Sequence, residues 1–249
     1  MFPTLHLTSS VMIPTYYVVI SLTVVLSLLW IVRRSEKLQL SLPRSLDLSL
    51  LIMVFGFIGG RLLHVFYESF DYYREDFWRI FYFWDGGFVY YGGAILAAIA
   101  GLAYLQRRAR HDRGRYLDML APVMSFAYAL GRSACLLAGC CYGKYCDLPW
   151  AIEGRHPTQL YAIAWELGVL CILLGFEKGR RLPSAPFKAA GQLFYLWLVL
   201  HGIGRLIMES FRDDFRGPTL GLSVSSWISI AIVILGLILL SKKPVNTKS

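Results

Sequence analysis

The sequence predicts an all-α, polytopic membrane protein with about seven transmembrane helices. Hydrophobic residues make up 56% of its 249 positions and charged residues only 16%, and the mean hydropathy is +0.52. A soluble domain of this size carries about a quarter charged residues. The apolar residues come in long blocks, and about 20 such residues span a bilayer core. We therefore expect one membrane-embedded domain over residues 1–249.

Seven apolar blocks are long enough to cross a membrane. They run roughly over residues 16–32, 46–67, 87–105, 116–137, 159–176, 190–210 and 220–240. The start of the chain lacks the basic region of a cleaved signal peptide, so the first block is expected to stay in the membrane.

Lysine and arginine concentrate in alternate connections, at 33–45, 106–115 and 177–189, and in the tail after 240. The positive-inside rule places these segments in the cytoplasm, so with seven spans the N-terminus lies outside and the C-terminus inside. The net charge of +9 is spread over short loops rather than gathered on one face. We therefore expect no nucleic-acid partner, and a basic balance suits contact with anionic membrane lipid.

Three arginines within the apolar blocks each follow a glycine: Arg61, Arg132 and Arg205. Glycine lets neighbouring helices approach closely, so each arginine can face a shared interior rather than lipid. All three are expected in the outer half of the membrane, and Glu209 lies one helical turn after Arg205. The cluster is either a set of structural ion pairs or an anion site, since a guanidinium suits bidentate contact with phosphate.

The segment that enters the third block from outside, WDGGFVYYGG, carries Tyr91, Gly92 and Gly93. Its two glycine pairs permit a bend or a re-entrant backbone, which membranes tolerate only beside protein or a polar cavity. The preceding loop, 68–86, is acidic and aromatic. We expect a short interfacial helix there, which either anchors the chain or contacts substrate.

The segment RHPTQLY enters the fifth block from outside. Pro157 suits a helix start, with Gln159 and Tyr161 in the first turns. His156 beside it is either a base or phosphate contact, or a structural residue at the edge of the span.

Four of the five cysteines follow the spacing C-x4-CC-x4-C, namely Cys135, Cys140, Cys141 and Cys146. No C-x-x-C pair is present, so the spacing gives little support to a zinc site. An outward-facing disulfide, packing as small residues and redox chemistry all remain open. Cys171 is expected to pack within a span.

These segments together resemble the bacterial prolipoprotein diacylglyceryl transferase family. Five motifs carry the resemblance in order: FIGGRLLHVFY at Phe57–Tyr67, WDGGFVYYGG at Trp84–Gly93, DMLAPVMSFAYALGRSACLLAGCCYG at Asp118–Gly143, RHPTQLY at Arg155–Tyr161 and GRLIMESFR at Gly204–Arg212. They cover most of the chain from the second block to the sixth.

The resemblance implies transfer of the diacylglyceryl group of phosphatidylglycerol to the lipobox cysteine of a prolipoprotein signal peptide, which forms a thioether. It places the protein in the bacterial inner membrane with its active site facing the outer side. Arginines would stabilise the departing phosphate, and a base would generate the thiolate nucleophile. No metal and no cofactor is implied.

By their match to the motifs, Arg132 and Arg205 correspond to the family's essential arginines, with Glu209 as partner of Arg205. Arg61 and His156 fall in shared motifs. Where family members usually carry a histidine base, this chain has Tyr91, and an unperturbed tyrosine, with a pKa near 10, is a poor base. His201 stands where the family often has tyrosine, so we hypothesise that His201 performs or shares the work expected at Tyr91.

Two further departures bear on function. Cys135, Ala138 and Cys140 replace polar residues of the family pattern, and only residues 144–154 stand where the family has a larger outer insertion. We expect a small or missing outer head. The alternative to transfer is a paralogue without activity, or with altered specificity, that binds phospholipid as an accessory membrane protein.

Overall fold

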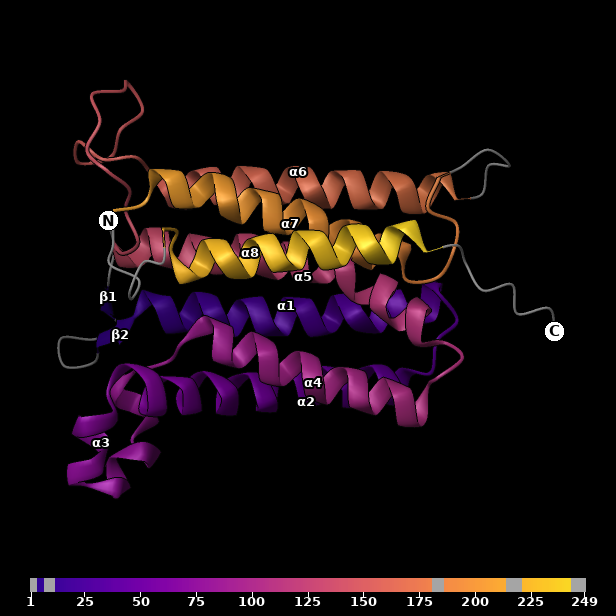
Figure 1. Cartoon of the computed structure of the whole chain (residues 1–249), viewed down its shortest axis with the longest axis horizontal. Coiled ribbons are helices and arrows are strands. Elements are labelled where there is room, and N and C mark those ends of the chain that lie inside the picture. The colour runs from indigo at the N-terminus through magenta and orange to yellow at the C-terminus, as the bar shows by residue number, and fades with distance from the viewer. Residues whose placement is uncertain (1–3, 7–11, 181–185, 214–220, 243–249) are drawn as a thin grey trace. The chain divides into compact units, whose positions relative to one another are not determined.

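The structure is a computed structural model that describes residues 4–6, 12–180, 186–213 and 221–242 (Figure 1). The described chain is α-helical apart from one small antiparallel hairpin, β1 (Thr4–His6) with β2 (Met12–Pro14). The long helices are α1 (Thr15–Lys37), α2 (Leu42–Leu63), α4 (Tyr90–Arg108), α5 (Arg113–Ala138), α6 (Thr158–Gly179), α7 (Gln192–Phe211) and α8 (Val224–Ser241).

Six described helices are long and apolar enough to cross a membrane, which confirms the polytopic class. They are α1, α2, α5, α6, α7 and α8. The predicted block at 87–105 corresponds to α4, which starts with two tyrosines and a glycine pair and ends in Gln-Arg-Arg. These polar ends lower the mean hydropathy of α4, which is not among the six helices named above. The tail lysines from Lys243 onward, used for the predicted orientation, lie outside the described residues.

The chain forms two compact units, which are described separately. The first unit comprises Met1–Ile31 and Gly114–Ser249, and the second comprises Val32–Arg113. Of the predicted site residues, Arg61, Tyr91, Gly92 and Gly93 belong to the second unit, and the others belong to the first.

In the second unit, α2 packs closely against α4 through glycines. A Cβ atom on Gly92 would lie 2.3 Å from the carbonyl oxygen of Gly59, and one on Gly93 would lie 2.6 Å from that of Gly56. The bend predicted for this region occurs at the first glycine pair, where Gly86 and Gly87 have φ of 79° and 77°. The second pair continues the helix and lets the two backbones touch.

The acidic, aromatic loop of this unit is largely helical, as the sequence predicts. A π-helical turn at His64–Glu68 leads into the short helix α3 (Phe70–Glu75), and 3-10 turns follow at Phe77–Phe81 and Phe83–Asp85. Several of its aromatic rings are exposed, among them Phe77, Trp78 and Trp84.

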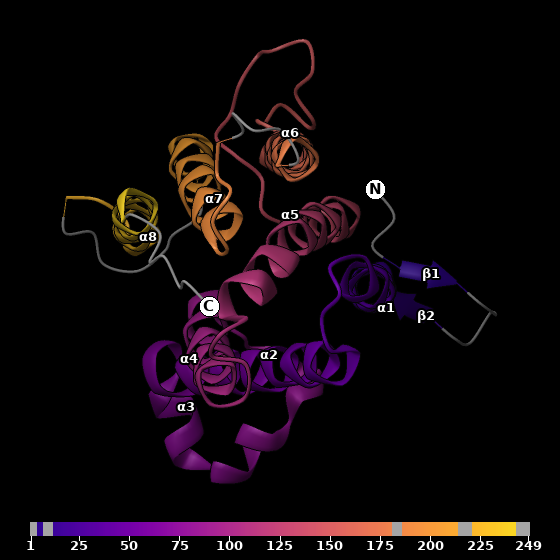
Figure 2. The same cartoon turned by 90° about the vertical axis from the view of Figure 1, so that its right-hand side faces the viewer.

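In the first unit, α7 lies between α6 and α8 (Figure 2). Two of its glycines allow the close contact. A Cβ atom on Gly204 would lie 2.2 Å from Nε1 of Trp165 on α6, and one on Gly202 would lie 2.6 Å from Cγ2 of Val233 on α8. Small residues at these positions therefore set the spacing of the three helices.

Asp118 on α5 holds the first turn of α7. Its carboxylate accepts hydrogen bonds from the backbone N–H groups of Gly191 at 2.9 Å, Leu193 at 2.9 Å and Phe194 at 3.2 Å. It also pairs with Arg180 at 2.9 Å. A carboxylate at a helix N-terminus satisfies unpaired N–H groups and complements the helix dipole. Asp118 therefore fixes the helix on which His201, Arg205 and Glu209 lie.

Asp118→Asn should destabilise the protein by about 2 kcal/mol, because hydrogen bonds to a charged group contribute about 1.5–3 kcal/mol and the substitution removes the charge. Thermal unfolding of the detergent-solubilised protein measures this as a lower midpoint. Asp71→Asn, at an exposed position of α3, is the matched control and should leave the midpoint unchanged. Equal unfolding midpoints for both variants would show that the hydrogen bonds from Asp118 to the start of α7 contribute nothing to stability.

Candidate active site

Arg205 is a buried charge of the predicted site, with only 8% of its surface exposed. Its Nη1 donates to the hydroxyl of Tyr128 at 3.3 Å, and its Nη2 donates to Oγ of Ser225 at 3.0 Å. Glu209 lies one turn further along α7, 3.7 Å from the same Nη2. The i, i+4 pairing expected from the sequence is therefore present.

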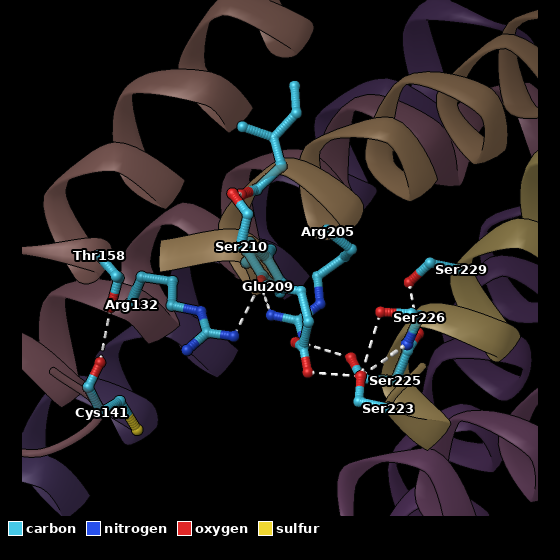
Figure 3. A network of polar contacts seen from close by, with 12 residues as sticks. Arg132, Cys141, Thr158, Arg205, Glu209, Ser210, Ser223, Ser225, Ser226 and Ser229 are labelled. Atoms are coloured by element: carbon cyan, nitrogen blue, oxygen red, sulfur yellow. Dashed lines mark hydrogen bonds and ion pairs between the residues drawn. The ribbon is translucent and has the colours of Figure 1, made fainter. Parts of the chain in front are cut away.

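The carboxylate of Glu209 links α7 to the start of α8. Its Oε1 accepts a hydrogen bond of 2.7 Å from Oγ of Ser223. Ser223 is also the N-cap of α8, because its Oγ accepts from the backbone N–H of Ser226. The polar contacts of Arg205 and Glu209 thus continue into a serine-rich turn (Figure 3). Hydrogen-bonding both members of a buried ion pair offsets the cost of removing them from water.

Arg132 extends from α5 toward Arg205 (Figure 3). Its Nη2 donates to the hydroxyl of Tyr128 at 2.7 Å, and its guanidinium carbon lies 4.9 Å from the centre of the Tyr128 ring. The two arginines therefore share one hydroxyl group. Among the described residues, Arg132 makes no ion pair with a carboxylate, whereas Arg205 pairs with Glu209.

Tyr128 is the residue that sequence reasoning missed. It lies four residues before Arg132, so the two side chains share one face of α5. That spacing was the available signal, but a tyrosine near the end of an apolar span is common and carries little information. Only the fold shows that the same hydroxyl also meets Arg205 of another helix.

His201 is buried against an acidic partner. Its Nδ1 lies 2.5 Å from Oε1 of Glu166 on α6, and Oε2 of Glu166 accepts a 2.6 Å hydrogen bond from Oγ of Ser125 on α5. An ionised carboxylate only accepts hydrogen bonds. Nδ1 is therefore the donor toward an ionised Glu166, and in the neutral form of that tautomer Nε2 is the acceptor. Carboxylate–imidazole pairs of this kind orient a histidine for general-base chemistry.

Aromatic rings connect His201 to the arginine pair. The imidazole stacks on Trp197, with ring centres 5.0 Å apart, and meets the edge of Tyr128 at 4.8 Å. A small cavity in the same region is lined by Tyr128, Glu166 and Arg205, together with Ala162, Trp165, Gly204 and Met208. The histidine and the two arginines thus share one neighbour, Tyr128.

The RHPTQLY segment forms the start of α6, as Pro157 suggests. Nδ1 of His156 lies 3.2 Å from the hydroxyl of Tyr161, which also accepts from Trp150. Gln159 is fully buried and donates through Nε2 to the carbonyl of Cys140. No described residue provides a partner for its amide oxygen. His156 and Tyr161 pack with Phe211 at the end of α7.

Arg61 has a different environment from the other two arginines. Its guanidinium donates to the backbone carbonyls of the loop that precedes α4, at Arg79, Ile80, Tyr82, Gly86 and Gly87. These contacts use Nε, Nη1 and Nη2, and the side chain is 5% exposed. The geometry favours a loop-ordering role over the predicted phosphate contact, because the donors are already in use.

Tyr91 lies in the first turn of α4, half-buried beside Tyr90 at a ring distance of 5.5 Å. Gly92 and Gly93 follow it in the α2–α4 contact. Tyr91 and His201 belong to different units, so the hypothesis that they exchange roles stays a prediction.

The five cysteines are free thiols, and the disulfide considered from their spacing is not present among them. Hydrogen bonds with the thiols of Cys135 and Cys140 lower the pKa of Cys141, and the positive charge of Arg212 lowers it further. Hydrogen bonds with Cys135 and Cys141 raise the pKa of Cys140.

The fold and the site define a polytopic membrane protein with charged residues gathered between α5, α6 and α7. A family model described as prolipoprotein diacylglyceryl transferase matches residues 3–242. The chain belongs to this family, which is a family of transferases.

Curated relatives carry the name phosphatidylglycerol–prolipoprotein diacylglyceryl transferase. The protein from Clostridium tetani is 28% identical over 89% of this chain and 90% of its own length. That from Methylobacillus flagellatus is 33% identical over 79% of this chain and 77% of its own length. The similarity thus extends over most of each chain.

Tyr128→Phe should lower the rate of diacylglyceryl transfer by about 10- to 100-fold, because it removes the acceptor shared by two arginines and such charged hydrogen bonds contribute about 1.5–3 kcal/mol. The measurement is kcat/KM in detergent with phosphatidylglycerol and a lipobox peptide. Tyr104→Phe, whose hydroxyl pairs with Asp47 in the other unit, is the matched control. A Tyr128→Phe variant as fast as this control would contradict the role of the shared hydroxyl.

Proposed function

We propose that this protein transfers the diacylglyceryl group of phosphatidylglycerol to the lipobox cysteine of a prolipoprotein signal peptide. The cysteine sulfur attacks the glyceryl carbon that carries the phosphate ester. A carbon–sulfur bond forms, the carbon–oxygen bond breaks, and glycerol phosphate leaves with the bonding electrons. The thiol proton passes to a base.

The observation that carries the proposal is the arginine pair at Tyr128. Arg132 and Arg205 approach one hydroxyl from two helices, and Glu209 is paired with Arg205. Two guanidinium groups in a partly buried site suit a phosphodiester. They also stabilise the additional negative charge that the phosphate gains as it leaves, and this stabilisation contributes more to catalysis than the binding of the lipid does. Guanidinium groups match phosphate oxygens geometrically.

His201 is the proposed base, because Glu166 orients its imidazole and leaves Nε2 to accept a proton. A thiolate is a far better nucleophile than a thiol, so proton removal contributes directly to the rate. The packing of His201 against Tyr128 places it next to the proposed phosphate site. Gln159, His156 and Tyr161 at the outer start of α6 would contact the lipid or the peptide.

The proposed orientation has the N-terminus outside and the C-terminus in the cytoplasm, which sets the site in the outer half of a bacterial inner membrane. The basic connections at 33–45 and 106–115 support it. Phosphatidylglycerol would enter sideways from the bilayer, and the signal peptide would present its cysteine at the same depth.

Complementation tests the activity. Expression in a bacterium depleted of its own diacylglyceryl transferase should restore growth and lipoprotein maturation. Arg132→Lys and Arg205→Lys should fail at equal expression, because lysine keeps the charge but loses the bidentate fork. If the unaltered chain is well expressed, binds phosphatidylglycerol and still fails, the accessory lipid-binding function replaces the transferase.

His201→Ala and Glu166→Gln should each reduce kcat by about 100-fold or more, the usual contribution of a general base. KM for phosphatidylglycerol should change little, because neither residue is proposed to hold the lipid. Rates in detergent separate the two constants, with Glu36→Gln, at an exposed position, as the control. The assignment fails if His201→Ala leaves transfer intact while Tyr91→Phe abolishes it.

A further inference from the structure

Three thiols come together at the outer end of α5. The Sγ atoms of Cys135, Cys140 and Cys141 all lie within 4.8 Å of one another. The helix ends at Ala138, and the chain then turns back because Gly139 and Cys141 have φ of 73° and 67°. This left-handed turn brings the vicinal pair onto the last turn of the helix, with the backbone N–H of Cys140 donating to the carbonyl of Cys135 at 3.1 Å.

The spacing of the sulfur atoms is close to that of a three-thiolate metal site. With metal–sulfur bonds of about 2.3 Å, the sulfur atoms around one ion are about 4 Å apart. The Cys140 and Cys141 sulfurs are already 3.5 Å apart, and the third lies within 4.8 Å of both. Thiolates select soft or borderline ions such as Cu⁺, Zn²⁺ and Cd²⁺ over Mg²⁺ or Ca²⁺.

The surroundings suit negative sulfur ligands. Arg212, buried at the end of α7, supplies a positive charge beside Cys141. Three thiolates around a divalent ion carry a net negative charge, which this arginine partly offsets. Ion binding releases the thiol protons to solvent.

The turn is also held from the opposite side. The carbonyl of Cys141 accepts a 2.7 Å hydrogen bond from Thr158 (Figure 3). The carbonyl of Cys140 accepts from Gln159, and both donors lie in the first turn of α6. The cluster is therefore attached to two helices of the candidate active site. Cys135 lies one turn after Arg132 on α5. An ion here would fix the outer ends of α5 and α6 relative to each other.

We propose that Cys135, Cys140 and Cys141 form a binding site for one thiophilic metal ion, which clamps the outer end of α5. Cys146, in the same loop, and Cys171, in α6, lie outside the cluster. The site is independent of the proposed transfer reaction, so either proposal can fail without the other.

The test uses the full chain, purified in detergent under reducing conditions, stripped with a chelator and titrated anaerobically with Cd²⁺. The expected result is one Cd²⁺ per chain by elemental analysis, an ultraviolet sulfur-to-metal charge-transfer band, and a higher midpoint of thermal unfolding. Three thiols should also become protected from alkylation.

Cys140→Ser should weaken Cd²⁺ binding by at least about 100-fold, since even partners outside the first shell contribute 10- to 100-fold. Cys146→Ser and Cys171→Ser are matched controls and should bind as the unaltered chain does. The unfolding midpoint without metal shows whether each variant is folded. The proposal is overturned if no stoichiometric ion binds, if Cys140→Ser binds equally well, or if Cys146→Ser loses the ion instead.

Discussion

The burial of Arg205 is the constraint on which the first unit depends. An arginine at the centre of a membrane helix costs roughly 2.5–3.5 kcal/mol on insertion scales, so its donors need partners. Tyr128 on α5, Glu209 on α7 and Ser225 on α8 supply them. These three helices must therefore lie close together, and Gly202 of α7 permits the close contact with α8. The packing of the helices and the chemistry of the site thus have one physical cause.

The same arrangement divides the charged residues by role. Arg61 uses its donors on loop carbonyls, and Asp118 uses its carboxylate on the first turn of α7. Both are buried charges with a structural role. Arg132 differs, because its described polar partner is a neutral hydroxyl. An ionisable residue within a membrane that lacks an opposite charge is a functional-site hypothesis by default, and this cation supports the proposed anion site.

Much of the fold could be predicted from sequence, since hydropathy alone locates the spans. The Arg205–Glu209 pair was also accessible, because it depends on local helical spacing. The loop contacts of Arg61 could not be predicted, because a glycine–arginine pair does not reveal whether the arginine meets a loop or a cavity. Tyr128 and Ser125 were missed because neutral polar residues in apolar spans give no signal until another helix faces them. The cysteine cluster needed the positive φ of Cys141, which spacing does not encode.

The central claim is that the arginine pair binds a phosphate ester whose glyceryl group is then transferred to sulfur. The most direct measurement is mass spectrometry of a lipobox peptide after incubation with the purified protein and phosphatidylglycerol of known acyl composition. The account predicts a mass increase of one diacylglyceryl group on the lipobox cysteine, with release of glycerol phosphate, and loss of both products in Arg132→Lys. An unmodified peptide in the presence of bound phosphatidylglycerol would contradict it.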